Sequence, residues 1–283
     1  MQGMLKQKNK VIERIGDKMD APLAIQICEE KNMVYGKDRK YVISLYDYTG
    51  EALKPWAEAG YICFAYDIQH TEERTEMFDG GGRITYKYAD LHNIETLDNI
   101  FDYFETIRRD HGTDNRVVFG MAFPVCTDLA VSGAAHFKRK AERDPEFQTK
   151  ASDHAKWCAD LFDALGCPYF IENPVSVLAT KWRKPDYSFH PYEYGNYIHD
   201  DEAEHPRWPE YIAAKDAYPK KTCLWTGNGF TMPWTDPVEP EKGHSRQHLK
   251  LGGKSAKTKN IRSATPRGFA RAVYEFNSME TTQ

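Results

Sequence analysis

The chain has 283 residues, of which 41% are hydrophobic and 28% charged, which is ordinary for a globular protein with one large domain. Its net charge of -4 excludes a protein that is basic throughout, so binding of a polyanion would need a local basic surface. No apolar stretch is typical of a signal peptide or approaches the roughly 20 residues that span a bilayer. We therefore expect a cytoplasmic protein with no membrane partner.

The six cysteines include no Cys-x-x-Cys pair, which favours free thiols in a reducing compartment. His154, Cys158 and Cys167 lie close together in the sequence, but their spacing is too irregular for a zinc site. We therefore expect no metal.

A βαβ unit is predicted after an N-terminal extension over residues 1–40. The apolar run 41–46 predicts a strand, 51–59 a helix with Pro55 in its first turn, and 61–66 a second strand. A Gly-containing turn joins the first strand to the helix, and an acid follows the second strand. This arrangement is typical of a parallel α/β sheet.

Strands and helices continue to alternate along the chain. Further helices are predicted over 94–109 and 151–165, and further strands over 116–122, 168–171 and 222–225. We therefore expect an open, mostly parallel, Rossmann-like α/β sheet with helices on both faces, formed by a catalytic core over 41–195. Residues 196–283 are predicted to form a small irregular region of loops and short strands that returns to the core.

Three polar positions fall where ligands bind in such sheets, at the carboxyl ends of strands. They are the turn from Asp47 to Gly50, Asp67 after the second strand, and Asp90. Asp67 could accept hydrogen bonds from ribose hydroxyls, and Asp90 could meet an adenine amino group. The turn is not Gly-x-Gly-x-x-Gly, which favours an uncharged nucleoside over a dinucleotide. A turn glycine with two strand-end caps explains the same residues equally well.

Cys126 follows the strand at 116–122, and Glu172 follows the strand at 168–171. A lone cysteine is more often a small buried hydrophobic residue, but the two strand ends could converge on one pocket. A thiolate that adds to C6 of cytosine, with an acid at N3, makes C5 nucleophilic enough to accept a methyl group. One Cys and one Glu facing a flat pocket would meet that requirement.

Pro124-Val125-Cys126 resembles the Pro-Pro-Cys nucleophile motif of DNA cytosine-5 methyltransferases, and Glu172-Asn173-Pro174 resembles the Glu-Asn-Val motif that grips the cytosine. The resemblance covers about residues 41–180 and is strongest to the compact bacteriophage versions. It implies an S-adenosylmethionine-dependent methyltransferase fold, with Cys126 and Glu172 as catalytic residues. The cofactor-binding residues that it implies are Tyr46, Asp47, Thr49, Gly50, Asp67, Ile68, Asp90 and Pro124.

The chain departs from the family pattern at four points. Val125 replaces the second proline of the nucleophile motif, and the cofactor turn lacks the first family glycine. No Gln-x-Arg-x-Arg strand is found, so Arg246, Lys259 or Arg262 would have to replace it. The usual large target-recognition domain is also absent, which leaves at most a reduced recognition segment after residue 195.

The stretch 242–274 contains nine Lys or Arg residues and no acid, and therefore predicts a local polyanion-binding surface. A mobile, solvated basic loop is the alternative. The candidate nucleic-acid contacts are Lys250, Lys254, Lys257 and Arg262. If the substrate is duplex DNA, the cytosine must flip out of the stack to be reached.

The sequence leaves three hypotheses open. The first is methylation of cytosine C5 in DNA through a covalent Cys126 adduct, with the phage DNA-modification or restriction-modification role that the resemblance implies. The second is the same ring-carbon chemistry on a free cytidine nucleotide, or another base modification. The third is a degenerate, inactive methyltransferase fold that binds nucleic acid or a protein partner.

Overall fold

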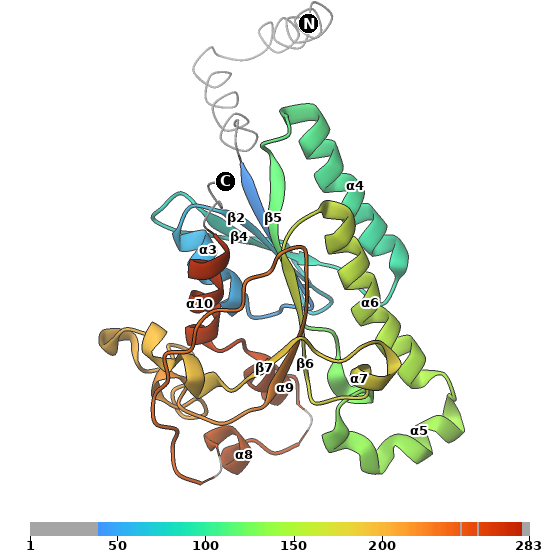
Figure 1. Cartoon of the computed structure of the whole chain (residues 1–283), viewed down its shortest axis with the longest axis vertical. Helices are drawn as coiled ribbons and strands as arrows, with labels where there is room; N and C mark the ends of the chain where they lie inside the picture. Colours follow the sequence, from blue (N-terminus) through green and yellow to red (C-terminus); the bar gives the residue numbers. More distant parts are fainter. Residues whose placement is uncertain (1–38, 244, 254, 279–283) are drawn as a thin grey trace, which may run out of the picture.

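The computed structural model describes residues 39–243, 245–253 and 255–278 (Figure 1). Nearly all of the predicted extension over 1–40, and Lys254, lie outside the described residues. An eight-stranded sheet forms the centre of the molecule, with the strand order β3-β4-β2-β1-β5-β6-β8-β7. The strands are β1 (Lys40–Leu45), β2 (Ile62–Asp67), β3 (Arg74–Met77), β4 (Arg83–Tyr88), β5 (Arg116–Ala122), β6 (Tyr169–Pro174), β7 (Tyr187–Phe189) and β8 (Thr222–Gly227).

Five neighbouring strands, from β4 through β2, β1 and β5 to β6, are parallel. β3 is antiparallel to β4 at one edge, and β8 lies antiparallel between β6 and β7. The chain builds outward from β1 to β2 and β4 on one side, and then to β5 and β6 on the other. In sheets of this kind, ligands bind beyond the carboxyl ends of the strands, at the point where the strand order reverses. We therefore expect a binding site in the loops after β1 and β5.

The central strands are apolar throughout because both faces of the sheet are covered. Along β1, Ile43 and Leu45 pack in one hydrophobic cluster while Val42 packs in the other, and β2 alternates in the same way. β5 comes very close to its covering helix at Gly120, where an added Cβ would lie 2.3 Å from the ring of Phe162. A side chain at this position would push the helix away from the sheet.

Helices cover the two faces unequally (Figure 1). The first cluster contains α4, α6 and α7, and the second contains α3 and α10. The helices are α3 (Lys54–Glu58), α4 (Ile94–His111), α5 (Phe137–Arg143), α6 (Phe147–Leu165), α7 (Leu178–Lys181), α8 (Arg246–Lys250), α9 (Ala256–Ser263) and α10 (Arg267–Asn277). Short 3-10 helices add η1 (Glu51–Leu53), η2 (Cys126–Asp128), η3 (Val131–His136), η4 (Pro191–Tyr197), η5 (Asp200–Glu202) and η6 (Ala214–Asp216).

The predicted mostly parallel sheet with helices on both faces is confirmed. The helix expected over 51–59 is divided into η1 and α3, with Pro55 in the first turn of α3 as predicted. The helix expected over 151–165 begins earlier, at Phe147, and ends at Gly166 in the left-handed conformation. The strands β3, β4 and β7 were not predicted.

Residues 196–283 were expected to form loops and short strands, but their described part contains β8 and the helices α8, α9 and α10. A third hydrophobic cluster lies within this part of the chain, around Ile212, Tyr218, Leu251 and Ile261. α10 then packs against η1 and α3, which returns the chain to the core. No described helix is long and apolar enough to cross a bilayer.

Candidate active site

The loop after β5 carries Cys126 at the carboxyl edge of the sheet. Its path is fixed at the start, where Phe123 N donates to Leu45 O of the neighbouring β1 at 3.0 Å. Cys126 begins η2 and is partly exposed, whereas the other described cysteines, Cys63, Cys158, Cys167 and Cys223, are buried. Cys126 is therefore the described thiol that a reagent or substrate can reach.

The end of β6 and the chain that follows it run beside the Cys126 loop. Asn173, which is 1% exposed, donates its Nδ2 hydrogen to Pro124 O at 2.9 Å. Two backbone hydrogen bonds continue the contact, from Val131 N to Val175 O at 3.1 Å and from Val177 N to Leu129 O at 3.0 Å. The two predicted motifs therefore lie together in the structure, although they are far apart in the sequence.

Glu172 is close enough to Cys126 for its charge to act on the thiol. Burial raises the pKa of the Cys126 thiol, and the Glu172 carboxylate raises it further. Burial also raises the pKa of Glu172. Both groups therefore favour their neutral forms, so the site can supply a protonated acid but must deprotonate its thiol before that thiol can act as a nucleophile.

Lys220 is the cation of this site, and the sequence analysis did not assign it. Its charge lowers the pKa of both Cys126 and Glu172, against the larger effect of burial. Its Nζ donates to Arg262 O of α9 at 2.8 Å, which fixes the ammonium group. The only signal in the sequence was the Lys220-Lys221 pair immediately before β8.

A small cavity lies over Glu172. Lys220 and Thr222 line one side of it, and the segment 263–266 with Phe269 covers it. Its volume of about 10 Å³ gives room for about one water molecule. A pyrimidine ring is larger than this cavity, so its entry there requires the segment 263–266 to move away from Glu172.

The turn after β1 is held by its own side chains. Asp47 is buried, and its carboxylate accepts from Ser44 Oγ at 2.8 Å, Thr49 N at 3.0 Å and Gly50 N at 2.7 Å. Burial raises the pKa of Asp47, and these hydrogen bonds oppose the rise. Asp47 and Thr49, both predicted cofactor residues, therefore shape the turn and are not presented to a ligand by their side chains.

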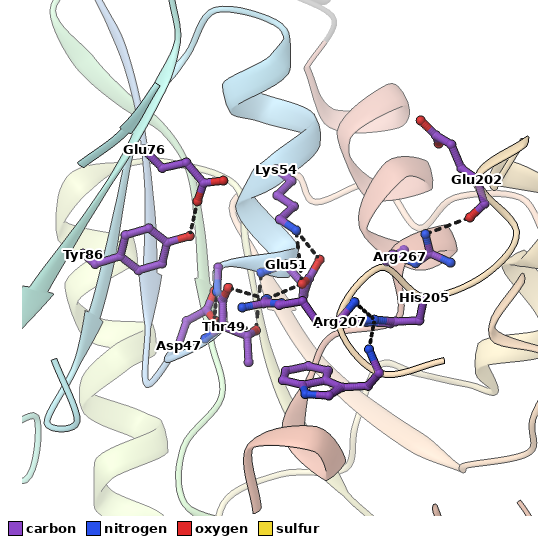
Figure 2. A network of polar contacts seen from close by, with 12 residues as sticks. Asp47, Thr49, Glu51, Lys54, Glu76, Tyr86, Glu202, His205, Arg207 and Arg267 are labelled. Carbon is purple, nitrogen blue, oxygen red and sulfur yellow. Dashed lines mark hydrogen bonds and ion pairs between the residues drawn. The ribbon is translucent and has the colours of Figure 1, made fainter. Parts of the chain in front are cut away.

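Gly50 was expected to let a ligand approach the backbone. Its φ of 69° favours glycine, and an added Cβ would lie 2.5 Å from the hydroxyl oxygen of Tyr86. Tyr86 in turn donates to Glu76 at 3.0 Å (Figure 2). The glycine is thus required by the packing of β4 against the turn.

A cluster of charged residues that the sequence analysis missed surrounds the other side of this turn (Figure 2). The side chain of Glu51 is fully buried and forms ion pairs with Lys54 and Arg207. Arg207 also donates to Thr49 O at 2.9 Å. Arg207 therefore holds a segment about 160 residues further along the chain against the turn. No local pattern in the sequence predicts this contact.

The predicted residues after β2 and β4 lie near one another. Tyr46 has a φ of 57° and donates its hydroxyl to Leu91 O at 2.7 Å. Burial raises the pKa of Tyr46, and the nearby Cys158, Asp90 and Asp67 raise it further. Asp67 is buried and accepts from Gln69 N at 2.8 Å. Asp90 is half-exposed and contacts His92 Nδ1 at 3.3 Å.

Exposed apolar side chains gather around these acids. Ile68 is 47% exposed and Tyr88 is 61% exposed, next to Asp67 and Asp90 respectively. Tyr48 is also exposed and stacks on His70, with ring centroids 5.4 Å apart. Flat apolar surface beside carboxylates suits a nucleoside, whose base needs stacking and whose ribose needs hydrogen-bond acceptors.

The four residues predicted to bind nucleic acid do not share one environment. Lys250 is exposed at the end of α8, and Lys257 lies over the ring of Tyr211 at 5.5 Å. Arg262 donates to Leu251 O at 2.6 Å, so its guanidinium is partly used within the protein. Lys254 lies outside the described residues.

The part of the chain that the structure describes contains no group of three or more His, Cys, Asp or Glu side chains that could hold a metal ion. A scan against models of known protein families and a search of curated proteins both find no match for the chain. The function must therefore be argued from the site itself.

Proposed function

We propose that this protein transfers a methyl group from S-adenosylmethionine to C5 of a cytosine in DNA, with Cys126 as nucleophile. The observation that carries the proposal is the approach of Cys126, Glu172 and Lys220 at the carboxyl edge of the sheet. The sheet order, which reverses beside β1, is compatible with the Rossmann-like sheet implied by the family resemblance.

The roles follow from the electrostatics of the three groups. Glu172, whose pKa is raised by burial, donates to N3 of the ring in its protonated form and draws electrons away from C6. Cys126 gives its thiol proton to water, Lys220 favours the thiolate that results, and the thiolate adds at C6. C5 accepts the methyl group and loses its proton to water, and the Cys126 sulfur leaves as C5 and C6 regain their double bond.

The residues after β1, β2 and β4 fit the adenosine part of the proposed cofactor. Asp67 uses only its Oδ1 oxygen within the described residues, which leaves Oδ2 to accept from a ribose hydroxyl. Ile68 and Tyr88 offer apolar surface beside it. The cofactor supplies an electrophilic methyl group when bound, and the chain supplies the orientation.

Transfer of a labelled methyl group tests the proposal. Incubation with methyl-labelled S-adenosylmethionine and duplex DNA should place label at C5 of cytosine, and Cys126→Ser should abolish it. Cys223→Ser is the matched control because Cys223 is a buried thiol of β8, and it should retain transfer. Label on an exocyclic amine, or transfer by Cys126→Ser, would contradict the proposed chemistry.

A free cytidine nucleotide is the second candidate substrate. The segment after residue 195 was the expected place for a target-recognition unit. Arg207 of this segment packs instead onto the turn after β1, which favours a substrate that needs no such unit. Adding dCMP in parallel with DNA separates the two substrates, since label found only in the nucleotide would remove DNA from the proposal while keeping the ring chemistry.

A further inference from the structure

Helix α5 is fastened directly to the nucleophile loop. Lys140 of α5 donates to Thr127 O at 3.0 Å and to Asp128 at 2.5 Å, and both of these residues belong to η2 with Cys126. The Lys140 ammonium also lies 6.0 Å from the ring of Phe147 at the start of α6. The Lys140 side chain therefore ties α5 to the 3-10 helix that begins at Cys126.

The outer surface of α5 carries cations without partners. Lys138, Arg139 and Arg143 are exposed, and no hydrogen bond or ion pair joins their side chains to another residue in the described ranges. Arg139 and Arg143 are four residues apart and share one face of the helix. By contrast, Lys150 and Lys156 of α6 are paired with acids.

The spacing of these cations fits an extended anion. At about 1.5 Å per residue, Lys138 and Arg143 are about 7.5 Å apart along the helix axis, and their side chains do not converge as the donors for a single phosphate would. Val125 and Val131, on the loop that α5 holds, are also exposed, at 45% and 51%. Apolar surface next to separated cations matches the bases and backbone of a nucleic acid.

We propose that α5 is a binding surface for the phosphate backbone of duplex DNA, so that the DNA lies across Cys126 with α5 on one side. The inference rests on the proposed function for its choice of DNA. It makes the substrate a polymer, because the single phosphate group of a nucleoside monophosphate such as dCMP cannot meet cations that are spread along a helix. The surface is local, since the chain as a whole carries a net charge of -4.

Charge reversal on α5 provides the test. We compare Lys138→Glu/Arg139→Glu with Arg108→Glu/Arg109→Glu, an adjacent basic pair in the last turn of α4 whose reversal changes the net charge equally. Binding of a fluorescently labelled DNA duplex is measured by anisotropy over a range of salt concentrations, without cofactor. Thermal unfolding of both variants shows whether they remain folded.

The α5 variant should bind duplex DNA about tenfold or more weakly, and the slope of log affinity against log salt should fall by roughly 2, as expected for two lost phosphate contacts. The α4 variant should bind as the unchanged protein does. Equal affinities for the two variants, or preferential binding of a labelled RNA duplex, would overturn the proposal.

Methyl transfer by the unchanged protein keeps the two proposals distinguishable. Weakened DNA binding of the α5 variant, together with no transfer to DNA or dCMP by the unchanged protein, would leave α5 as a DNA surface and remove the methyltransferase function. If the α5 variant binds DNA as tightly as the unchanged protein does, and transfer to DNA is normal, the methyltransferase function stands and α5 is not a DNA surface.

Discussion

At the scale of single residues, burial and two nearby charges act on the reactive groups of the site. Burial disfavours the ionised forms of both Cys126 and Glu172, and the negative charge of Glu172 further disfavours the thiolate of Cys126. Lys220 opposes the rise in the pKa of both groups, so we expect its removal to raise the pKa of the Cys126 thiol.

Replacing Lys220 with Met should raise the pKa of Cys126, because the positive charge that stabilises the thiolate is lost. The pH profile for alkylation of Cys126 by iodoacetamide, followed by mass spectrometry, should move to higher pH. Lys221→Met is the matched control, since Lys221 is the exposed neighbour and does not act on Cys126. Identical profiles for the two variants would remove Lys220 from the site.

The sequence located Cys126 and Glu172 because each follows a recognisable apolar strand and a short motif. It did not locate Lys220, because that residue reaches the pair only through β8, which pairs antiparallel with β6. Lys220 and Lys221 look alike in the sequence, and only the alternation of side chains along the approach to β8 decides which one faces Glu172. Register between distant segments is not encoded in any local pattern.

At the scale of elements, the start of α10 is capped by a buried acid. Asp216 accepts from Gly268 N at 3.3 Å, and its φ of 50° lies in the left-handed region. Burial raises the pKa of Asp216 to about 6, although Arg267 and the helix hydrogen bonds oppose the rise. The folded state thus binds this proton more tightly than the unfolded state does.

The contribution of Asp216 to stability is therefore present below its unfolded pKa of 3.8 and is lost as pH rises through about 6. Asp216→Asn keeps a neutral acceptor and tolerates the positive φ. It should raise the free energy of unfolding relative to the unchanged protein at pH 8, by at most about 3 kcal/mol, with little difference near pH 4. Urea unfolding at both values checks this, and a less stable variant at pH 8 would refute it.

The turn after β1 depends on an element far along the chain. Arg207→Met should leave the buried Glu51 with Lys54 as its remaining partner and should destabilise the protein by roughly 1–3 kcal/mol. Calorimetry should also show weaker S-adenosylmethionine binding, because the turn loses the donor to Thr49 O. Arg207→Lys keeps the charge and should show smaller losses; equal losses would mean that charge has no part in the effect.

Elements with a clear hydrophobic period were predictable. The apolar runs of β1 and β2 and the apolar stripe of α4 identified them, since burial against a sheet that is covered on both faces dictates those patterns. β7, with three residues, and η1, formed where Pro55 interrupts the expected helix, are too short to show a period. Their positions depend on tertiary packing.

At the scale of the whole molecule, the sheet is completed by the last third of the chain. β7 pairs only with β8 among the described strands, and β6 also pairs with β8 on one side. α10 covers the face formed in part by α3. The surface that these late elements bury belongs to the same core as β1.

A chain that ends at residue 195 should therefore not fold cooperatively, although it contains every predicted catalytic and cofactor residue. It lacks β8 and α10, so the edge of β6 and one apolar face would be exposed to water. Near-ultraviolet circular dichroism should show little fixed aromatic packing, and heating should give no sharp transition. A cooperative transition would mean that residues 41–195 form an independent domain.

The central claim is that Cys126 forms a covalent bond to C6 of a cytosine in DNA. It is tested most directly by incubating the protein with S-adenosylmethionine and DNA that contains 5-fluorocytosine, whose C5 has no proton to lose after methyl transfer. The account predicts a protein–DNA adduct that survives denaturing electrophoresis, maps to the peptide containing Cys126 and is lost in Cys126→Ser. An adduct that persists in Cys126→Ser, or one attached at another cysteine, would contradict it.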